Sequence, residues 1–236
     1  MLENKIKFSS RYHDVLEAPK PSRMFIPEAY KKMPKDYTDN QKKISSTVKA
    51  CIPFLDALMT GYTIPFSTDI HCEYDYAETK MNFDISDHLE HDKDIFGVSG
   101  HNDAQIKTDL RHNKRTVEAV FKFINCWRIE TPPGYSCLFT QPLNQNCPFK
   151  IIDGVVDTDV HKLIINFPFY WTEDPQKKVI IKAGDPMVQV IPFKRESWKS
   201  SIEHLQDEKL HKSHVQWGTK FKDMYKQLAW RKKSYK

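Results

Sequence analysis

Hydrophobic and polar residues alternate with a period of two through the middle of the chain, a pattern typical of half-buried β-strands. Residues 70–76 and 81–85 alternate most clearly, and the polar residues 78–80 separate them. This predicts an antiparallel hairpin with an acidic outer face. Further strands are expected in short apolar runs between turns that contain Pro or Gly, at 135–140, 151–157, 162–167, 178–182 and 186–193. So many short strands predict a mainly β core, either a sandwich or a barrel.

The two ends of the chain lack this alternation. The first 45 residues hold four prolines, which interrupt any helical period and predict an extended arm laid on a larger body. Within 40–61, hydrophobic residues recur every three or four positions, so Pro53 is expected to start or kink a helix and Gly61 to end it. Helical spacing returns after about Glu196. We therefore expect an N-terminal arm with a helix (1–61), a β-rich core (62–196) and a helical tail (197–236).

Composition limits the class of protein. The 236 residues are 39% hydrophobic and 12% aromatic, which is enough apolar area for a core and too much for a disordered chain. No run approaches 18 apolar residues, so no membrane-spanning helix is expected, and the first residues show no apolar secretory signal. The five cysteines form no C-x-x-C pair, which predicts reduced thiols rather than a zinc site. Cys51, Cys126 and Cys137 lie in apolar surroundings and are expected to be buried.

The stretch 86–115 is polar and weakly patterned, which predicts a long loop. It contains His88, His91, His101 and His112, and acidic residues beside the first two suggest ligands for a metal ion. Because the sequence around these histidines is polar throughout, a solvated loop is favoured over a metal site. No metal-binding residue is therefore predicted.

Charge is distributed unevenly along the chain. The last 43 residues hold 12 Lys and Arg against 5 Asp and Glu, a net charge of +7, whereas the rest of the chain carries −2. In the tail, basic residues alternate with aromatic ones, a mixture that suits phosphate neutralisation and base stacking. However, the residues Trp217, Phe221, Tyr225 and Leu228 recur at helical spacing. This spacing favours a helix that docks its aromatic face on its own chain or on a neighbouring subunit, rather than on nucleic acid.

Three segments of the core resemble the trimeric dUTPases. Residues 154–159 read Gly-Val-Val-Asp-Thr-Asp, similar to the third motif of that family, and an apolar run ending in Asn166 follows. Residues 184–191 read Gly-Asp-Pro-Met-Val-Gln-Val-Ile, similar to the fourth motif, and 132–138 resemble the strand that precedes the second motif. The resemblance spans about residues 130–195, and it implies the β-clip fold that dUTPases share with dCTP deaminases.

The resemblance also implies roles for individual residues. Asp157 takes the position of the carboxylate that holds the attacking water, a role that suits a proton acceptor. Gly154, Val156 and Asp159 belong to the hairpin that binds the pyrimidine, and Gln189 lies in the fourth motif, near the pocket. Mg²⁺ is expected only together with a bound nucleotide. Two other interpretations stay open: paired Asp residues often cap a turn through side-chain hydrogen bonds, and Gln189 suits a buried polar network.

The sequence departs from the dUTPase pattern where phosphate chemistry needs donors. The Arg-Ser-Gly of the second motif is missing near residues 140–144, and Val160 replaces the tyrosine that packs under the sugar. The tail is basic and aromatic, not the Gly-rich arm that closes over a nucleotide. Because each lost phosphate contact weakens transition-state stabilisation, efficient dUTP hydrolysis is not expected.

The whole chain also resembles a family of proteins carried by tailed phages, through residues 51–57, 131–136 and 191–196. This resemblance implies no particular activity. Three functions follow as hypotheses: binding of a pyrimidine nucleotide without efficient hydrolysis, a phage structural or assembly role on an oligomeric scaffold, and nucleic-acid binding through the tail. The expected partners are further copies of the chain, with a trimer implied by the dUTPase resemblance, or phage structural proteins, and no membrane. The expected location is the host cytoplasm, or the virion for a structural protein.

Overall fold

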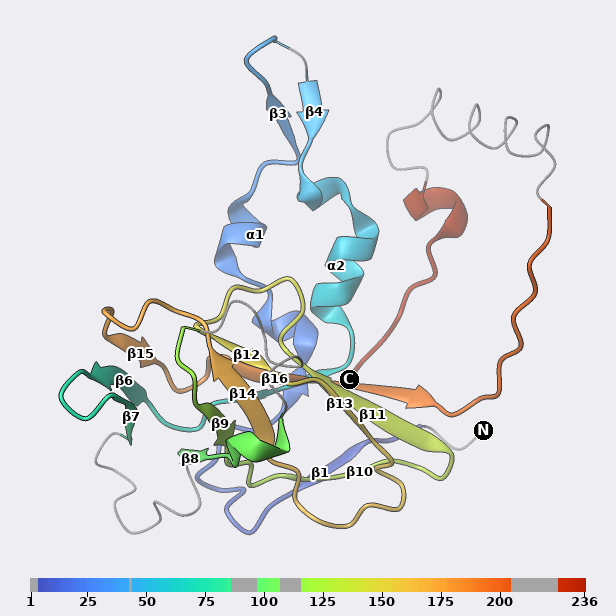
Figure 1. Ribbon diagram of the computed structural model, residues 1–236. Coiled ribbons are helices and arrows are strands. Elements are labelled where there is room, and N and C mark those ends of the chain that lie inside the picture. Colours follow the sequence, from blue (N-terminus) through green and yellow to red (C-terminus); the bar gives the residue numbers. More distant parts are fainter. Residues whose placement is uncertain (1–3, 43, 86–96, 107–115, 205–224) are drawn as a thin grey trace.

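A computed structural model describes residues 4–42, 44–85, 97–106, 116–204 and 225–236. The protein is mainly β, built of short strands in antiparallel sheets (Figure 1). This confirms the predicted fold class at the level of secondary structure. None of the helices in the described ranges is long and apolar enough to cross a membrane.

The described part of the chain contains sixteen strands and a few short helices, joined by loops. The strands are β1 (Lys7–Ser9), β2 (Lys20–Pro21), β3 (Asp36–Thr38), β4 (Ile44–Ser46), β5 (Tyr62–Pro65), β6 (Ile70–Asp75), β7 (Lys80–Ile85), β8 (Val98–Gly100), β9 (Val120–Phe123), β10 (Arg128–Glu130), β11 (Tyr135–Thr140), β12 (Phe149–Ile151), β13 (Gly154–Val156), β14 (Phe167–Trp171), β15 (Val179–Ile181) and β16 (Pro186–Lys194). The helices are η1 (Ser22–Phe25), α1 (Glu28–Lys32), η2 (Val48–Ala50), α2 (Ile52–Met59), η4 (Asp103–Gln105) and the π-helical turn η6 (Tyr225–Ala229).

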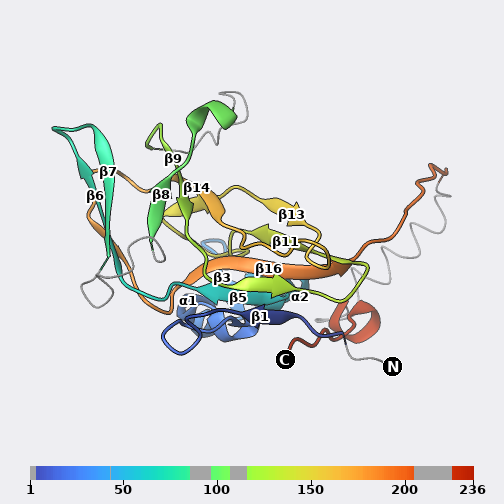
Figure 2. The same ribbon diagram turned by 90° about the horizontal axis from the view of Figure 1, so that it is seen from below.

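The strands form two larger sheets and three small ones. The main sheet has the order β13-β11-β16-β5-β2, and the second sheet has the order β12-β14-β9-β8. Figure 2 shows β16 and β5 of the main sheet as one layer, with β9 and β14 of the second sheet above it. Two small sheets pair β1 with β10 and β3 with β4, and the third has the order β15-β6-β7. The long strand β16 lies between β11 and β5 and contains most of the segment 184–191.

The predicted hairpin is confirmed. Strands β6 and β7 pair from Ile70 opposite Ile85 to Asp75 opposite Lys80. On β6, Ile70 and Cys72 are buried whereas His71 and Glu73, each the next residue along the strand, are exposed, as the period of two predicts. The strands predicted at 135–140, 178–182 and 186–193 are also present, with ends that differ by at most one residue.

Two strand predictions were wrong. The run 151–157 contains parts of two strands, β12 and β13, which belong to different sheets. The strand predicted at 162–167 begins only at Phe167 and continues to Trp171, where it pairs with β9 and β12. The apolar residues before it mimic a strand in sequence, but Leu163 and Ile164 are exposed rather than packed in a sheet.

The first 61 residues are more regular than an extended arm. Strand β1 pairs with β10 and β2 pairs with β5, so this part of the chain contributes to sheets of the core. Helix α1 begins directly after Pro27, and β3 and β4 form a hairpin that projects from the body (Figure 1). The predicted helix is confirmed as α2, with Pro53 in its first turn, but it does not include residues 44–50.

Gly61 allows the end of α2 to approach the main sheet closely. Its φ is +73°, a conformation that residues with a Cβ rarely adopt. A Cβ at this position would lie 2.2 Å from the carbonyl oxygen of Val190 on β16. The glycine that was predicted to end the helix therefore also fixes the helix against β16.

Several predictions on loops and tail need correction or lie outside the described residues. Cys51 is exposed, because it directly precedes α2 and is not part of the buried face, whereas Cys137 is buried and Cys126 is half-buried.

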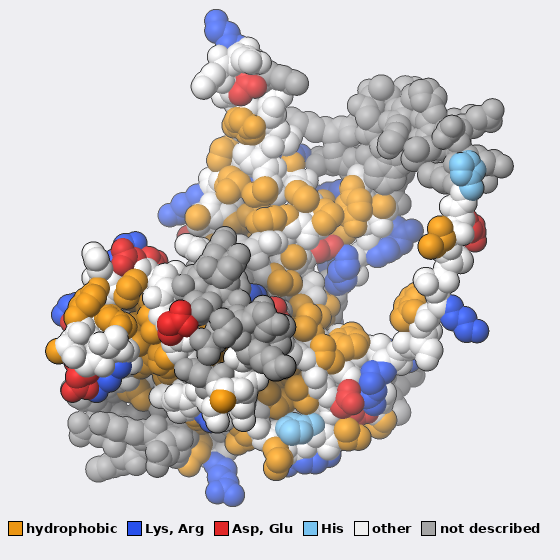
Figure 3. Space-filling model, in the orientation of Figure 1, with side chains coloured by type: hydrophobic (Ala, Val, Ile, Leu, Met, Phe, Trp, Pro, Cys, Tyr) orange, Lys and Arg blue, Asp and Glu red, His pale blue; other side chains and the backbone are white. Residues whose placement is uncertain are grey.

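Residues 197–204 form no helix but extend from the body after β16 (Figure 3). Most of the predicted tail helix, including Trp217 and Phe221, lies outside the described residues, as do His88, His91 and His112. Among the described residues, no group of three or more His, Cys, Asp or Glu could hold a metal ion.

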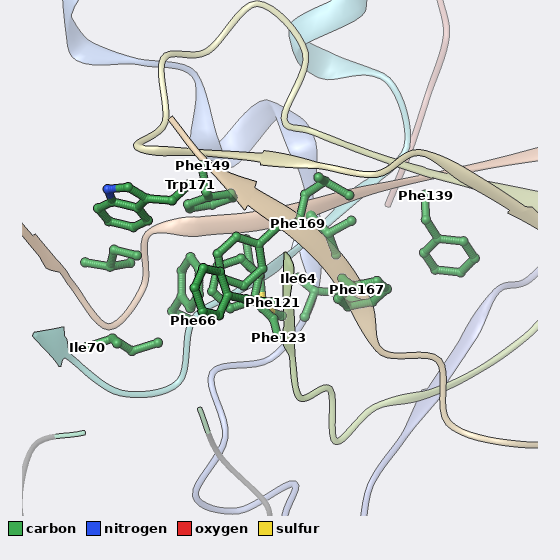
Figure 4. Packing of buried hydrophobic residues seen from close by; sticks show 14 of the residues in the cluster. Ile64, Phe66, Ile70, Phe121, Phe123, Phe139, Phe149, Phe167, Phe169 and Trp171 are labelled. Atoms are coloured by element: carbon green, nitrogen blue, oxygen red, sulfur yellow. The ribbon is translucent and has the colours of Figure 1, made fainter. Parts of the chain in front are cut away.

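An aromatic core lies between the two larger sheets. Phe123 of β9 stacks on Phe169 of β14 with ring centroids 3.8 Å apart, and Phe139 of β11 stacks on Phe167 of β14 at 5.6 Å. Phe169 and the neighbouring Trp171 are completely buried (Figure 4). Burial of a large side chain stabilises a fold by about 1.5–3 kcal/mol, so this cluster joins the sheets firmly.

Candidate functional site

The turn at residues 157–162 follows β13 and contains the carboxylates Asp157 and Asp159. Strand β13 is at the edge of the main sheet and, among the described strands, pairs only with β11. The turn closes on itself because the backbone N–H of His161 donates to the carbonyl oxygen of Asp157 at 2.8 Å. Gly154, Val156, Asp157 and Asp159 thus lie together in one strand and its turn, as the sequence predicts.

Asp159 is held by an arginine from the end of β16. The side chain of Asp159 is only 6% exposed. Arg195 donates to it with both terminal nitrogens, at 2.8 Å and 2.5 Å, and the backbone N–H of Gly134 donates at 2.8 Å. These hydrogen bonds, first those from Arg195 and then that from Gly134, hold the pKa of the carboxyl well below its ordinary value. These contacts favour the interpretation of Asp159 as a structural cap.

Asp157 faces solvent. Its side chain is 57% exposed, and its Oδ1 accepts a hydrogen bond from the Ser136 hydroxyl at 2.7 Å. Arg195 lies 3.2 Å from the same oxygen. A carboxylate with one oxygen engaged and its side chain open to water keeps the ability to bind a ligand or accept a proton.

Arg195 is the central residue that the sequence did not single out. It contacts both carboxylates of the turn, and it also donates to the carbonyl oxygen of Tyr135 at 3.1 Å and to the Ser136 hydroxyl at 3.2 Å. A signal was present, because β16 is a long strand that ends in a basic residue while the turn carries two acids. Only the register of β11 and β16, with Tyr135 opposite Lys194, brings these residues together.

Gln189 belongs to a buried network, not to the turn. It is 1% exposed, and its Oε1 accepts from the backbone N–H of Leu143 at 2.8 Å. Its Nε2 donates to the carbonyl oxygens of Ala57 at 3.0 Å and Thr60 at 2.6 Å. Since both ends of the amide are engaged, Gln189 ties α2 and the loop after β11 to β16. It lies on the far side of β11 from β13, so the structure does not bring it to Asp157.

The end of the tail docks on its own chain near α2. Asp56 accepts hydrogen bonds from the indole N–H of Trp230, at 3.1 and 3.0 Å, and from the Lys233 ammonium at 2.5 Å. The Tyr62 hydroxyl donates to the carbonyl oxygen of Lys236 at 3.1 Å. Two of the residues that would serve a nucleic-acid contact, Trp230 and Lys233, are therefore engaged within the chain.

The ion pair of Asp159 makes stability depend on pH. Because the folded pKa lies below the unfolded value of about 3.9, the pair stabilises fully above that pH and its contribution is lost as the pH falls through the folded pKa. We expect the Asp159→Asn variant to have a lower urea midpoint than the wild type at neutral pH. The difference should shrink as the pH is lowered from about 4 to about 2.

The matched control is Asp84→Asn, which alters an exposed carboxylate on β7. Its urea midpoint should stay close to that of the wild type over the same range. Equal midpoints for Asp159→Asn and the wild type at neutral pH would contradict a stabilising role of this ion pair.

Comparison with known proteins adds no relative to this picture. No protein-family model, no curated protein and no solved structure matches the chain. The function is therefore inferred from the contacts and exposed surfaces of the described residues.

Proposed function

We propose that the protein is a structural or assembly component that associates with further copies of itself. The observation that carries this proposal is the segment 197–204, which leaves the body after β16. In this segment the side chain of Trp198 is 86% exposed and that of Ile202 is 102% exposed. Figure 3 shows the segment extending from the body with hydrophobic side chains on it.

Exposure of these two side chains is unfavourable in an isolated chain. A tryptophan side chain offers roughly 150–250 Å² for burial, and each buried Å² of apolar surface contributes about 25 cal/mol. Single exposed apolar residues are ordinary, but two large ones on one extended segment indicate a surface that a partner covers. The segment follows Arg195, whose contacts with Asp157 and Asp159 fix where it leaves the body.

A complementary surface lies on the same molecule. The turn after β13 and the residues beyond it expose Val160 by 67%, Leu163 by 71% and Ile164 by 53%. We call these three residues the apolar patch. An association in which the segment of one copy covers the patch of the next is heterologous, and such contacts build closed rings or filaments. A ring suits the trimer that the dUTPase resemblance implies, and the resemblance to tailed-phage proteins agrees with a role in the virion or in its assembly in the host cytoplasm.

The proposal is tested by replacing both exposed side chains of the segment, as Trp198→Ser with Ile202→Ser. Light scattering after size-exclusion chromatography should give a multiple of 27.8 kDa for the wild type and the single-chain mass for the variant. The control replaces Val15 and Ile180, which are 60% and 48% exposed elsewhere on the surface, by serine. This control should keep the wild-type mass. A wild type that stays at 27.8 kDa at all concentrations would contradict the proposal.

A second candidate function is the binding of a pyrimidine nucleotide at β13 without efficient hydrolysis. It is supported by the free edge of β13, where no other strand of the described residues pairs with Gly154–Val156. Main-chain donors and acceptors at this edge, with the exposed Asp157 beside them, suit recognition of a base edge. Arg195 is engaged by Asp159, so it does not replace the missing arginine of the second motif as a phosphate donor. The fold implied for this function is the β-clip, and any Mg²⁺ would arrive with the nucleotide's phosphates.

The second candidate predicts a thermal shift with one of the nucleotides dUTP, dCTP or dUMP. A ligand at a hundredfold excess over its Kd adds about 2.7 kcal/mol to the free energy of unfolding. The Asp157→Asn variant should lose this shift, whereas Asp84→Asn should keep it. A wild type that shows no shift with any of the three would rule the candidate out.

A further inference from the structure

A groove of about 780 Å³ lies beside the turn at residues 157–162. Three separate segments line it: residues 9–12 after β1, residues 124–128 between β9 and β10, and residues 162–166 before β14. Its volume falls in the range of about 300–1,000 Å³ that small-molecule sites occupy. The exposed edge of β13 and the segment 197–204 do not line it.

The walls of the groove are held together by one buried amide. Asn125 is 2% exposed, and its Nδ2 donates to the carbonyl oxygens of Trp127 at 2.7 Å and Ile165 at 3.0 Å. Its backbone N–H donates to the Oδ1 of Asn166 at 3.0 Å. The pairing of β1 with β10 places Ser9 opposite Arg128 and fixes the third wall. The groove is therefore preformed, which reduces the entropy that a ligand must overcome.

Positive charge gathers on the groove. Each of the three segments contributes one cation, Arg11, Arg128 or Lys162. The carboxylate that contacts two of them is Glu130, which lies 3.0 Å from the Arg128 guanidinium and 3.5 Å from the Lys162 ammonium. Desolvation of Glu130 opposes ionisation, but the charges of Arg128, Lys7 and Lys162 outweigh it and lower the pKa of this carboxyl. Three cations against one ionised carboxylate leave an excess of positive charge at the groove.

The two arginines keep hydrogen-bond donors for a ligand. Arg11 is exposed and makes no ion pair or hydrogen bond with any other described residue. Arg128 uses Nη2 for Glu130, and its Nη1 makes no hydrogen bond with the described residues. Guanidinium groups bind phosphate with two parallel hydrogen bonds, which neither a lone lysine nor a neutral donor provides.

Apolar side chains line the remainder of the groove. Ile124 is half-buried on one side, and Leu163 and Ile164 are exposed on the other, with Tyr12 from the first segment. A ligand that combines a phosphate with a planar or apolar group matches both parts of this lining. From this arrangement we infer that the groove binds a small phosphate monoester of nucleoside monophosphate size, with its phosphate at Arg11 and Arg128.

The groove and the proposed assembly surface share Leu163 and Ile164, so the test uses the full chain carrying Trp198→Ser and Ile202→Ser. Failure of the assembly proposal then leaves this test unaffected. Titration calorimetry with UMP, inorganic phosphate and uridine should give saturable binding of UMP, weaker binding of phosphate and none of uridine. Affinity for UMP should fall as salt is added, because the cations are exposed to solvent.

Adding Arg11→Gln should weaken UMP binding roughly tenfold or more, the effect of a lost charged hydrogen bond. The matched control is Arg23→Gln, an exposed arginine on η1 away from the groove, which should bind UMP like the parent. Asp157→Asn should also bind normally, which separates this site from a nucleotide site at β13. The inference is overturned by absence of saturable UMP binding, by an Arg11→Gln variant as tight as the parent, or by tighter binding of single-stranded DNA than of UMP.

Discussion

The ion pair between Arg195 and Asp159 connects every surface to which we assign a role. It joins the first residue after β16 to the turn after β13, positions that are 36 residues apart in sequence. Arg195 also lies 3.2 Å from the exposed Asp157, and the segment 197–204 leaves the body just after Arg195. The same turn continues to Lys162, whose ammonium donates to the carbonyl oxygen of Asp159 at 2.9 Å and forms part of the groove.

The ion pair between Arg195 and Asp159 rests on a hydrophobic core that includes neither residue. Below the turn, Thr158 is completely buried, and its hydroxyl forms a hydrogen bond of 2.7 Å with that of Thr131. Deeper in the molecule, Phe139 of the main sheet stacks on Phe167 of the second sheet, with ring centroids 5.6 Å apart, and joins the two larger sheets. Because the core fixes the strands, Arg195, the backbone N–H of Gly134 and the Thr131 hydroxyl meet the turn in defined positions.

Much of the fold could be predicted from the periodicity of hydrophobic residues along the sequence, whereas much of the candidate site could not. The hairpin of β6 and β7, the strand β11 and the start of α2 at Pro53 are local patterns, which is why they were predictable. Arg195 and the groove depend on strand register and on segments that meet from distant parts of the chain, for which the sequence carries no local signal. For Gln189, the sequence suited a buried network and a ligand site equally well. Its three hydrogen-bond partners in the structure show that it belongs to a buried network.

Two surfaces of different chemistry thus meet beside one turn. The segment 197–204 and the apolar patch suit contacts between copies, whereas the groove suits a phosphorylated small molecule. Since Leu163 and Ile164 belong to both surfaces, association of copies would cover one side of the groove. If both proposals hold, ligand binding and assembly compete for this shared pair of residues.

The central claim is that the segment 197–204 contacts a second copy of the chain. The most direct measurement mixes ¹⁴N-labelled and ¹⁵N-labelled full chains, allows subunits to exchange, and joins neighbouring lysines with a short amine cross-linker. Lys199 lies in the segment and Lys162 lies next to the apolar patch. The account predicts peptides in which Lys199 of one isotope is joined to Lys162 of the other. Cross-links of Lys199 only within chains of a single isotope would contradict it.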